Sequence, residues 1–318
     1  MLTFGPVPSR RLGRSLGINN IPPKICTYSC VYCQLGKTFK MKIEPTEFYQ
    51  PKEILSEVQN KVEKAKKMQE SIDYLTFVPD GEPTLDINLG QEIKLIKSLG
   101  IKIAVITNSS LIDQKLVKEN LKEADLVSLK VDSVEEEIWR KVNHPHRNLC
   151  LKSILKGILE FSESFRGKII TETMLIRDIN DDSQNIKRVV DFLAQLKPSR
   201  SYLSLPIRPP ADRWVQSPSE EVVNRSYNLF KEKIEWVEYL IGYEGNAFAF
   251  TGNVEEDLLS ITSVHPMREE ALKDFLKRAH SDWSVIDRLI KQGQLVESEY
   301  EGHKFYIRKL KKSVIKNT

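Results

Sequence analysis

The sequence contains few of the features that mark secreted, fibrous or membrane proteins. It has only four cysteines, 14 glycines and 15 prolines in 318 residues, so its composition excludes a disulfide scaffold, a collagen-like repeat and a disordered chain. No apolar run approaches the roughly 18 residues that a membrane-spanning helix needs. The first residues, MLTFGPVPSRRLG, include no apolar stretch of signal-peptide length, which predicts a cytoplasmic protein without a membrane partner.

The chain also lacks a strong excess of one charge. Its 48 basic and 44 acidic residues give a net charge of +4, and the two signs are mixed along most of the sequence. A nucleic-acid binder often concentrates a larger basic excess on one face, so the total charge alone favours no partner. The length predicts one large domain with a small one, or two medium domains.

Short β-branched segments alternate with helical patterns along the first two thirds of the chain. Strand followed by helix, repeated about six times, predicts an α/β fold with a parallel sheet and right-handed crossovers. Six units suit an open or partial barrel better than a full eight-unit barrel. The predicted strands are Ser15–Asn19, Tyr74–Val78, Lys102–Thr107, Leu126–Val131, Lys168–Ile176 and Ser201–Pro206. The predicted helices are Pro51–Glu70, Gly90–Leu99, Asp113–Leu121, Leu149–Phe161 and Ser183–Leu196.

The pattern changes near residue 250, where three short helices and a β-hairpin are expected. This order is typical of a winged helix, and it predicts a large domain at 1–245 and a winged-helix-like domain at 246–318. The expected helices are Asn253–Ile261, Arg268–Ala279 and Ser281–Gln292, with Ser281 and Asp282 as caps of the third. The expected hairpin strands are Leu295–Glu299 and Lys304–Lys309.

Three of the four cysteines lie within eight residues. Cys26, Cys30 and Cys33 are expected on one loop just after the first strand. Iron–sulfur clusters are held by cysteine thiolates, usually four, so three thiols would hold three irons of a cubane and leave the fourth iron free for a ligand. The alternative is zinc, which prefers four closed ligands, and the fourth would have to come from Cys150 or a distant histidine.

The CxxxCxxC arrangement, with Tyr32 directly before the last cysteine, resembles the signature of the radical S-adenosylmethionine (radical SAM) superfamily. The resemblance covers roughly residues 1–245 and implies a partial (β/α)6 barrel, with a [4Fe-4S] cluster held by Cys26, Cys30 and Cys33. It further implies that the cluster binds S-adenosylmethionine and cleaves it after receiving one electron from a low-potential donor. The 5'-deoxyadenosyl radical so formed would abstract hydrogen from a substrate.

A second segment agrees with this resemblance. Asp80-Gly81-Glu82-Pro83 follows the second predicted strand and is similar to the family's GGE-type motif, which holds the methionine amino group. The resemblance therefore implies that Gly81, Glu82 and Pro83 bind the cofactor. Asp80 departs from the family, which has a glycine there. Without the resemblance, the segment reads as an ordinary βα turn.

The third and fourth predicted strands end in further polar groups. Asn108 lies in a segment that resembles the family's TNG-type motif, and alternation places Ser128, Lys130 and Asp132 on one face of the next strand. The resemblance implies cofactor contacts for Asn108, Ser128 and Asp132, and Lys130 is a candidate substrate contact. A buried ion pair is the alternative for the fourth strand. Because ligands sit at the carboxyl ends of strands in such barrels, the common position of these motifs supports a site there.

The sequence around the cysteines, together with the segment Leu205-Pro-Ile-Arg-Pro-Pro210, resembles the wyosine-synthase-like branch of iron–sulfur oxidoreductases within the superfamily. The best-known member of this branch resembles a two-cluster enzyme. Only Cys150 remains here beyond the first three cysteines, so one chain cannot supply three thiols to a second cluster. Arg208 is a second candidate substrate contact, because its forked guanidinium suits a carboxylate or phosphate, although a plain surface loop is as good an interpretation.

The last residues, from Lys304 to Lys316, include six basic residues and no acidic one. In a winged helix, Arg288 and Lys291 on the third helix and Lys304, Arg308, Lys309, Lys311 and Lys312 on the hairpin and tail could meet phosphates. Protein docking or a solvated tail are the alternatives. The sequence thus predicts a radical SAM enzyme of oxidoreductase or transferase type with an unidentified substrate, tRNA being one candidate. An iron–sulfur-sensing DNA-binding regulator and a glycyl-radical activase remain as other hypotheses.

Overall fold

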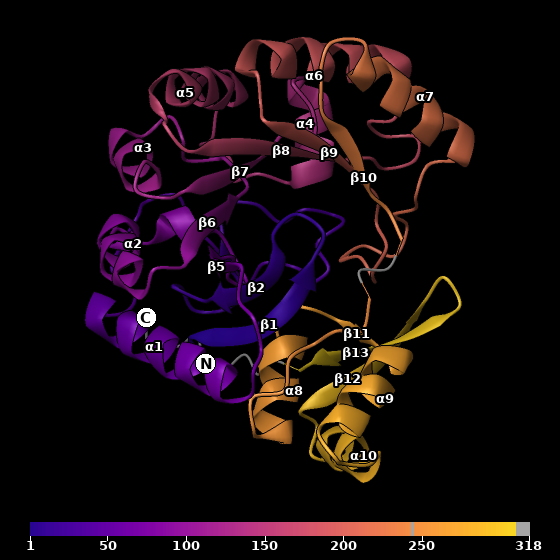
Figure 1. Ribbon diagram of the computed structural model, residues 1–318. Coiled ribbons are helices and arrows are strands. Elements are labelled where there is room, and N and C mark those ends of the chain that lie inside the picture. Colours follow the sequence, from indigo (N-terminus) through magenta and orange to yellow (C-terminus); the bar gives the residue numbers. More distant parts are fainter. Residues whose placement is uncertain (243–244, 310–318) are drawn as a thin grey trace.

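A curled eight-stranded sheet forms the centre of the molecule (Figure 1). The computed structural model describes residues 1–242 and 245–309. The strand order is β1-β2-β5-β6-β7-β8-β9-β10; β1 pairs antiparallel with β2, and the other neighbours pair in parallel. The strands are β1 (Thr3–Ser9), β2 (Gly13–Ile18), β5 (Tyr74–Phe77), β6 (Lys102–Thr107), β7 (Leu126–Lys130), β8 (Lys168–Met174), β9 (Arg200–Ser204) and β10 (Val237–Leu240).

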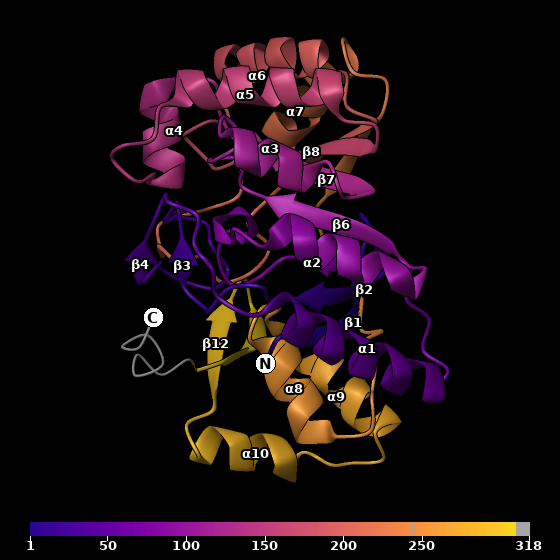
Figure 2. The ribbon, with the colours of Figure 1, turned by 90° about the vertical axis from the view of Figure 1, so that its left-hand side faces the viewer.

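Amphipathic helices cover the outer face of this sheet (Figures 1 and 2). In α1 the buried residues Ile54, Val58 and Val62 recur at helical spacing, while charged side chains occupy the opposite face. Such a helix becomes stable by burying that stripe against the strands. The helices between β2 and β10 are α1 (Pro51–Lys67), α2 (Leu89–Ile96), α3 (Lys115–Leu121), α4 (Glu136–Asn143), α5 (Leu151–Ser164), α6 (Ser183–Leu196) and α7 (Glu220–Lys231).

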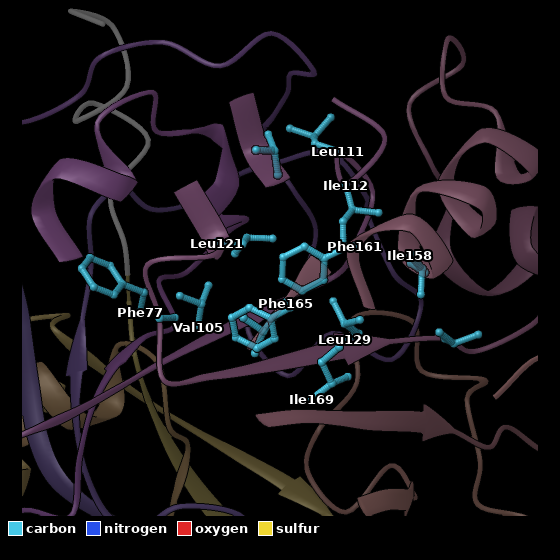
Figure 3. Close-up of a cluster of buried hydrophobic side chains, with 14 of the residues drawn as sticks. Phe77, Val105, Leu111, Ile112, Leu121, Leu129, Ile158, Phe161, Phe165 and Ile169 are labelled. Carbon is cyan, nitrogen blue, oxygen red and sulfur yellow. The ribbon is translucent and has the colours of Figure 1, made fainter. Parts of the chain in front are cut away.

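The main hydrophobic core lies between the sheet and these helices. Figure 3 shows Phe161 and Phe165 beside Leu129 and Ile169 in this layer. The two phenylalanine rings stack with centroids 4.8 Å apart, and Leu129 and Phe161 are fully buried. Packing of this density holds the strands at fixed positions, so the loops at their carboxyl ends can present side chains with a defined geometry.

All six predicted strands are present as neighbouring parallel strands of the sheet, which confirms the α/β partial barrel. The sequence prediction missed the two edge strands, β1 and β10, together with α4 and α7. β1 contains Pro6 and Pro8, which weaken a strand pattern, but prolines are tolerated at a sheet edge because no further strand needs their missing N–H groups. β10 has only four residues, and two of them are partly exposed.

The C-terminal part contains the three predicted helices and the hairpin, together with a short additional strand. Asp282 accepts a hydrogen bond from the Ser284 backbone N–H at 2.9 Å, so the third helix starts later than predicted and Ser281 lies outside it. The elements are α8 (Val254–Thr262), β11 (Met267–Arg268), α9 (Glu269–Arg278), α10 (Ser284–Lys291), β12 (Leu295–Tyr300) and β13 (His303–Arg308). The three strands form a separate sheet in the order β11-β13-β12 around a second core.

This C-terminal part packs against α1 and β1 (Figure 2). A buried ion pair joins the two, since Lys61 Nζ on α1 lies 2.7 Å from Asp257 Oδ1 on α8. Lys61 also donates to Thr251 Oγ1 at 2.8 Å, and Asp257 accepts from the Thr251 backbone N–H at 2.7 Å. Both charges of this contact are therefore paired and hydrogen-bonded. The C-terminal part is thus attached to α1 by a specific buried ion pair.

Several basic residues that could have met phosphates have partners inside the protein. Arg288 pairs with Glu255, Lys304 Nζ lies 3.0 Å from Glu297 Oε1, and Arg308 donates to the Leu259 carbonyl at 3.3 Å. The predicted contacts at Lys311 and Lys312 lie outside the described residues. In the parts of the chain that the structure describes, no helix combines the length and apolarity needed to cross a bilayer.

A buried pair of acidic side chains is formed by Asp86, directly after η1 (Pro83–Leu85), and Glu92 on α2. Asp86 and Glu92 are both completely buried. Burial raises the pKa of Asp86 to about 7 and that of Glu92 to about 9, and the Asp86 carboxyl adds to the rise at Glu92. The folded protein therefore keeps protons on this pair near neutral pH, where the unfolded chain, with carboxyl pKa values of about 4, has lost them.

We expect the free energy of unfolding to fall as pH rises from about 5 to 9, because the folded state binds more protons than the unfolded state in this range. The slope is at most about 1.4 kcal/mol per pH unit for each group. Glu92→Gln should flatten the upper part of this fall, as measured by denaturant titrations across the range. Glu63→Gln on the exposed face of α1 is the control, and a Glu92→Gln slope equal to that of the wild type would contradict the shared protons.

Candidate active site

The three clustered cysteines line one end of a cavity of about 300 Å³. Their loop starts with β3 (Ile25–Cys26), which pairs in parallel with β4 (Lys40–Met41). The backbone N–H of Cys33 then donates to the Cys30 carbonyl at 3.0 Å, and the N–H of Gly36 donates to the Cys33 carbonyl at 3.0 Å. These tight turns bring three side chains that are separated in sequence to one wall.

Gly81 is required because this loop passes very close to it. A Cβ atom at position 81 would lie 2.0 Å from the carbonyl oxygen of Ile25, the residue before Cys26. The two residues form a parallel bridge, and the Glu82 backbone N–H donates to the same carbonyl at 3.3 Å. The glycine therefore lets the cysteine loop pack directly against the carboxyl end of β5.

Glu82 joins the ends of two strands. One of its carboxylate oxygens accepts from the hydroxyls of Thr84 at 2.7 Å and Thr107 at 2.6 Å, and the other accepts from the Asn108 backbone N–H at 2.8 Å. Burial raises the pKa of Glu82, and these donors oppose the rise. The carboxylate lines the cavity, but its bonds also hold the β5 turn and the β6 end together. Pro83, beside it, is buried and is not among the cavity-lining residues.

Asn108 connects this network to the cysteine loop. Its amide nitrogen donates to Thr27 Oγ1 at 2.8 Å and lies 3.5 Å from Cys26 Sγ. Ser128 also lines the cavity, at the middle of β7. Both predicted residues thus face the cavity, and Thr27 is an additional polar group that the sequence prediction did not identify.

Asp132 does not line the main cavity but lies behind Tyr32. Its carboxylate accepts from the Tyr32 hydroxyl at 2.5 Å and from the Asn143 amide at 2.8 Å. The same amide nitrogen is 3.5 Å from Cys30 Sγ. Asp132 therefore positions the aromatic ring and the amide that surround the second cysteine, and its predicted cofactor contact stays a prediction. Asn143 is the last residue of α4, a helix that the pattern missed, so the sequence did not predict its contacts with Asp132 and Cys30.

Charged groups around Glu172 also line the cavity. Glu172 accepts from Arg11, from Lys130 Nζ at 3.0 Å and from Ser204 Oγ at 3.0 Å. Although burial acts in the other direction, these cations lower the pKa of Glu172 to about 2, so it stays ionised. The Lys130 ammonium lies 4.8 Å from the centroid of the Tyr32 ring. Lys130 thus faces the cavity as predicted, but as part of an ion pair whose partner the sequence analysis had not singled out.

Arg208 lines the cavity and also contacts the C-terminal part of the chain. Its guanidinium donates to Gln34 Oε1 at 2.5 Å and lies 3.0 Å from His265 Nε2. Gln34 follows Cys33 directly, and its amide also donates to the Val264 carbonyl at 3.1 Å. Arg208, the predicted substrate contact, therefore lines the cavity, and the buried His265 of the C-terminal part lies against it.

The cysteine end fits an iron–sulfur cluster better than a single metal ion. Among the described residues, no three His, Cys, Asp or Glu side chains converge closely enough to hold one ion. That spacing disfavours zinc, whereas each cysteine of a cubane binds a different iron atom. Burial raises the pKa of all three thiols, that of Cys30 to about 12, so binding a cluster must displace their protons.

Comparison with known proteins agrees with this geometry. The family model described as the radical SAM superfamily matches residues 20–193, which include the cysteine loop, the Glu82 turn and β7. The chain belongs to the radical SAM superfamily. Members of this superfamily use a [4Fe-4S] cluster and S-adenosylmethionine, and these are the cofactors of this protein. The three thiols at one end of an open cavity are suited to hold the cluster.

Individual relatives resemble the chain over most of its length. A UPF0026 protein of Methanocaldococcus jannaschii is 47% identical over 312 residues, covering 98% of this chain and 97% of the relative. The solved structure of TYW1 with a lysine-pyruvate adduct bound has a TM-score of 0.55 at 18% identity, covering 70% of this chain and 74% of the other. Streptococcus suis SuiB bound to S-adenosylmethionine has a TM-score of 0.50 at 15% identity, covering 72% and 50%.

Cys150 differs from the other cysteines in ways that an alkylation experiment can detect. It is exposed at the start of α5, and hydrogen bonding by Ser153 lowers its pKa. We expect iodoacetamide to modify Cys150 first in cluster-free protein, because the thiolate is the reactive species and burial keeps the other thiols protonated. Peptide mass mapping over time measures the order. The urea-unfolded chain is the control, and equal rates at Cys30 and Cys150 in the folded protein would contradict the expectation.

Proposed function

We propose that this protein reductively cleaves S-adenosylmethionine and uses the 5'-deoxyadenosyl radical to abstract hydrogen from an anionic substrate. One observation carries the proposal. A single cavity is lined both by three cysteines that suit a cluster and by several cationic side chains. When bound, the cluster supplies the electron that breaks the sulfonium bond, and a low-potential electron donor would reload it. The reaction would be of oxidoreductase or transferase type.

The charge of the cavity wall supports an anionic substrate. Besides Lys24, four cationic side chains line the cavity, and the Glu172 carboxylate pairs with two of them, Arg11 and Lys130. Glu172 holds Lys130 in its charged form, since the nearby carboxylates raise the Lys130 pKa against the effect of burial. A charged lysine and a forked arginine are suited to bind a carboxylate or phosphate. The four cations are Arg10, Arg11, Lys130 and Arg208.

Tyr32 and the apolar residues of the cavity wall would also limit side reactions of a radical formed beside the cluster. The Tyr32 hydroxyl is bonded to Asp132 and its ring lies beside the Lys130 ammonium, so the ring has a fixed position in the cavity wall. Val78, Ile106, Met174 and Leu240 add apolar surface to the same cavity. These side chains would exclude water and leave few polar hydrogens beside the reacting atoms, which protects a radical from side reactions.

Loss of one cluster thiol should abolish the chemistry. In anaerobically reconstituted protein reduced in the presence of S-adenosylmethionine, we expect 5'-deoxyadenosine to form, and Cys30→Ala to reduce its yield to background. Liquid chromatography of the quenched reaction measures the product. Cys150→Ala is the matched control and should retain wild-type yield, because Cys150 lies on the exposed surface away from the cavity. Absence of 5'-deoxyadenosine from the wild type would refute the proposal.

We further propose tRNA as the substrate and a winged helix for residues 246–309. The branch of the superfamily that the chain resembles includes an enzyme that modifies a tRNA base, and the order of three helices and a hairpin supports the winged helix. Arg288 and Lys304 are held in ion pairs, so fewer cations are available to bind phosphate on the surface of the C-terminal part. The cations that line the cavity are therefore the main support for a nucleic-acid substrate. A flipped nucleotide, with its phosphate, has the charge that this wall would bind.

Turnover with bulk tRNA tests this choice. We expect a nucleoside of changed mass after anaerobic incubation with tRNA, S-adenosylmethionine and reductant, as detected by mass spectrometry of the digested RNA. Omission of reductant and the Cys30→Ala protein are the controls, since both should lack the radical chemistry. An unchanged nucleoside profile, together with normal 5'-deoxyadenosine formation, would reject tRNA while leaving the radical chemistry intact.

A further inference from the structure

Three loops at the carboxyl end of the sheet are bonded to one short segment, residues 27–33, which includes two of the clustered cysteines. The hydroxyl of Thr38 donates to a backbone carbonyl of this segment at 2.6 Å. The backbone N–H groups of His146 and Asp212 donate to two others, at 2.9 Å and 3.0 Å. In Figure 2, β3, β4 and α4, which adjoin two of the loops, lie on the side toward which β6 points. We call these three loops the rim loops; they are residues 34–42, 143–149 and 207–216.

The rim loops are continuous with the wall of the cavity. Gln34 and Thr38 of the first loop and Arg208 of the third line the cavity directly. In the second loop, the amide nitrogen of Asn143 lies 3.5 Å from Cys30 Sγ. A ligand seated on the rim loops would therefore extend into the cavity without a break.

The rim loops have a one-sided charge, although the whole chain does not. They contain six cationic residues and one acidic residue, whereas the whole chain has 48 and 44. The one acid is Asp212, whose Oδ1 lies 2.8 Å from Lys37 Nζ. Arg147 and Arg213 are exposed, and among the described residues neither has an ion-pair partner. The six cations are Lys37, Lys40, Lys42, Arg147, Arg208 and Arg213.

The same loops expose two large aromatic side chains. Phe39 is 44% exposed and Trp214 is 52% exposed, and each is followed or preceded in sequence by a cation. Unpaired nucleic-acid bases stack on aromatic faces while cations beside them bind the phosphates. In a double helix the bases already stack on each other, so two exposed rings would have no base to contact. Aromatic rings among cations thus favour single-stranded nucleic acid over a duplex.

We propose that the rim loops bind a single-stranded segment of RNA, with unpaired bases on Phe39 and Trp214 and phosphates on Arg147 and Arg213. This inference rests on the RNA substrate of the proposed function and adds the surface that holds it. The cavity of about 300 Å³ also has to hold the cofactor, so nucleotides next to a flipped one must lie outside it. The rim loops are the surface that such neighbours meet first.

Removal of one ring tests the stacking contact. Binding of a fluorescent single-stranded RNA of about 12 nucleotides is measured by anisotropy with the full-length, cluster-loaded, unreduced protein. We expect Trp214→Ala to weaken binding by about fivefold to 150-fold, the usual range for one lost stacking contact, and Trp214→Phe to restore most of it. Trp236→Ala is the matched control. Trp236 is 57% exposed but directly precedes the parallel strand β10, at the opposite edge of the sheet, so its loss should have no effect.

The salt dependence of binding tests the phosphate contacts separately. Arg147→Gln and Arg213→Gln should each reduce the slope of log K against log salt concentration by about 0.7, the value for one phosphate contact to a single strand. Trp214→Ala should leave this slope unchanged, because stacking releases no counterions. Lys102→Gln and Lys168→Gln, exposed at the amino ends of β6 and β8, are the controls and should keep the wild-type slope. A general loosening of the loops cannot produce this division between affinity and slope.

Several results would overturn the proposal. Iron content is measured for every variant, and only fully loaded proteins are compared. An effect of Trp214→Ala no larger than that of Trp236→Ala, or unchanged slopes in both arginine variants, would reject the surface. Equal affinity for the duplex of the same sequence would reject single-stranded recognition. Displacement of the RNA by a polyglutamate peptide at equal charge concentration would show that the loops bind any polyanion, including an acidic protein, and would reject RNA as the specific partner.

The surface and the proposed function can fail independently. If the variants show the expected pattern but no nucleoside changes mass during turnover, the rim loops remain an RNA-binding surface and tRNA is rejected as the reacting substrate. If nucleosides change while the rim variants bind RNA as the wild type does, the surface is rejected and the substrate stands.

Discussion

The site depends on one buried carboxylate, that of Glu82. Its two oxygens accept hydrogen bonds from the turn after β5 and from the end of β6, so two adjacent strand ends cannot move apart without leaving a charge unpaired in the interior. Gly81 beside it allows the cysteine loop to approach within backbone contact. The glycine and the glutamate of this short motif thus position the loop and the strand ends relative to each other. The other residues that line the cavity surround this fixed arrangement of the cysteine loop, Gly81 and Glu82.

The parts of the fold that follow from short-range pattern were predictable. β6 and β7 are runs of buried apolar residues, and the sequence places their ends within a residue of the observed ones. The cysteines, Gly81 and Glu82 could be identified because they belong to short motifs with a recognisable spacing. The edge strands β1 and β10 were missed because prolines, short length and partial exposure weaken the alternation that marks a strand.

The residues that complete the site were harder to find for a different reason. Glu172, Asn143 and His265 are isolated in sequence, and each becomes significant only through a partner more than 40 residues away. Local pattern includes no information on such pairs. Asp132 shows the complementary error, since alternation placed it on the correct face but could not reveal that Tyr32 stands between it and the cavity. Predicting which face a side chain occupies is therefore easier than predicting what it touches.

The contact between Arg208 and His265 links the order of synthesis to the assembly of the site. The cavity is lined by Arg10 and Arg11 near the start of the chain, and the arginine on its opposite side rests on a histidine near the end. A ribosome-bound chain that stops short of His265 has the three cysteines but lacks the support behind Arg208. The contact behind Arg208 thus forms only after the residues around His265 have been synthesised and have packed against the rest of the protein.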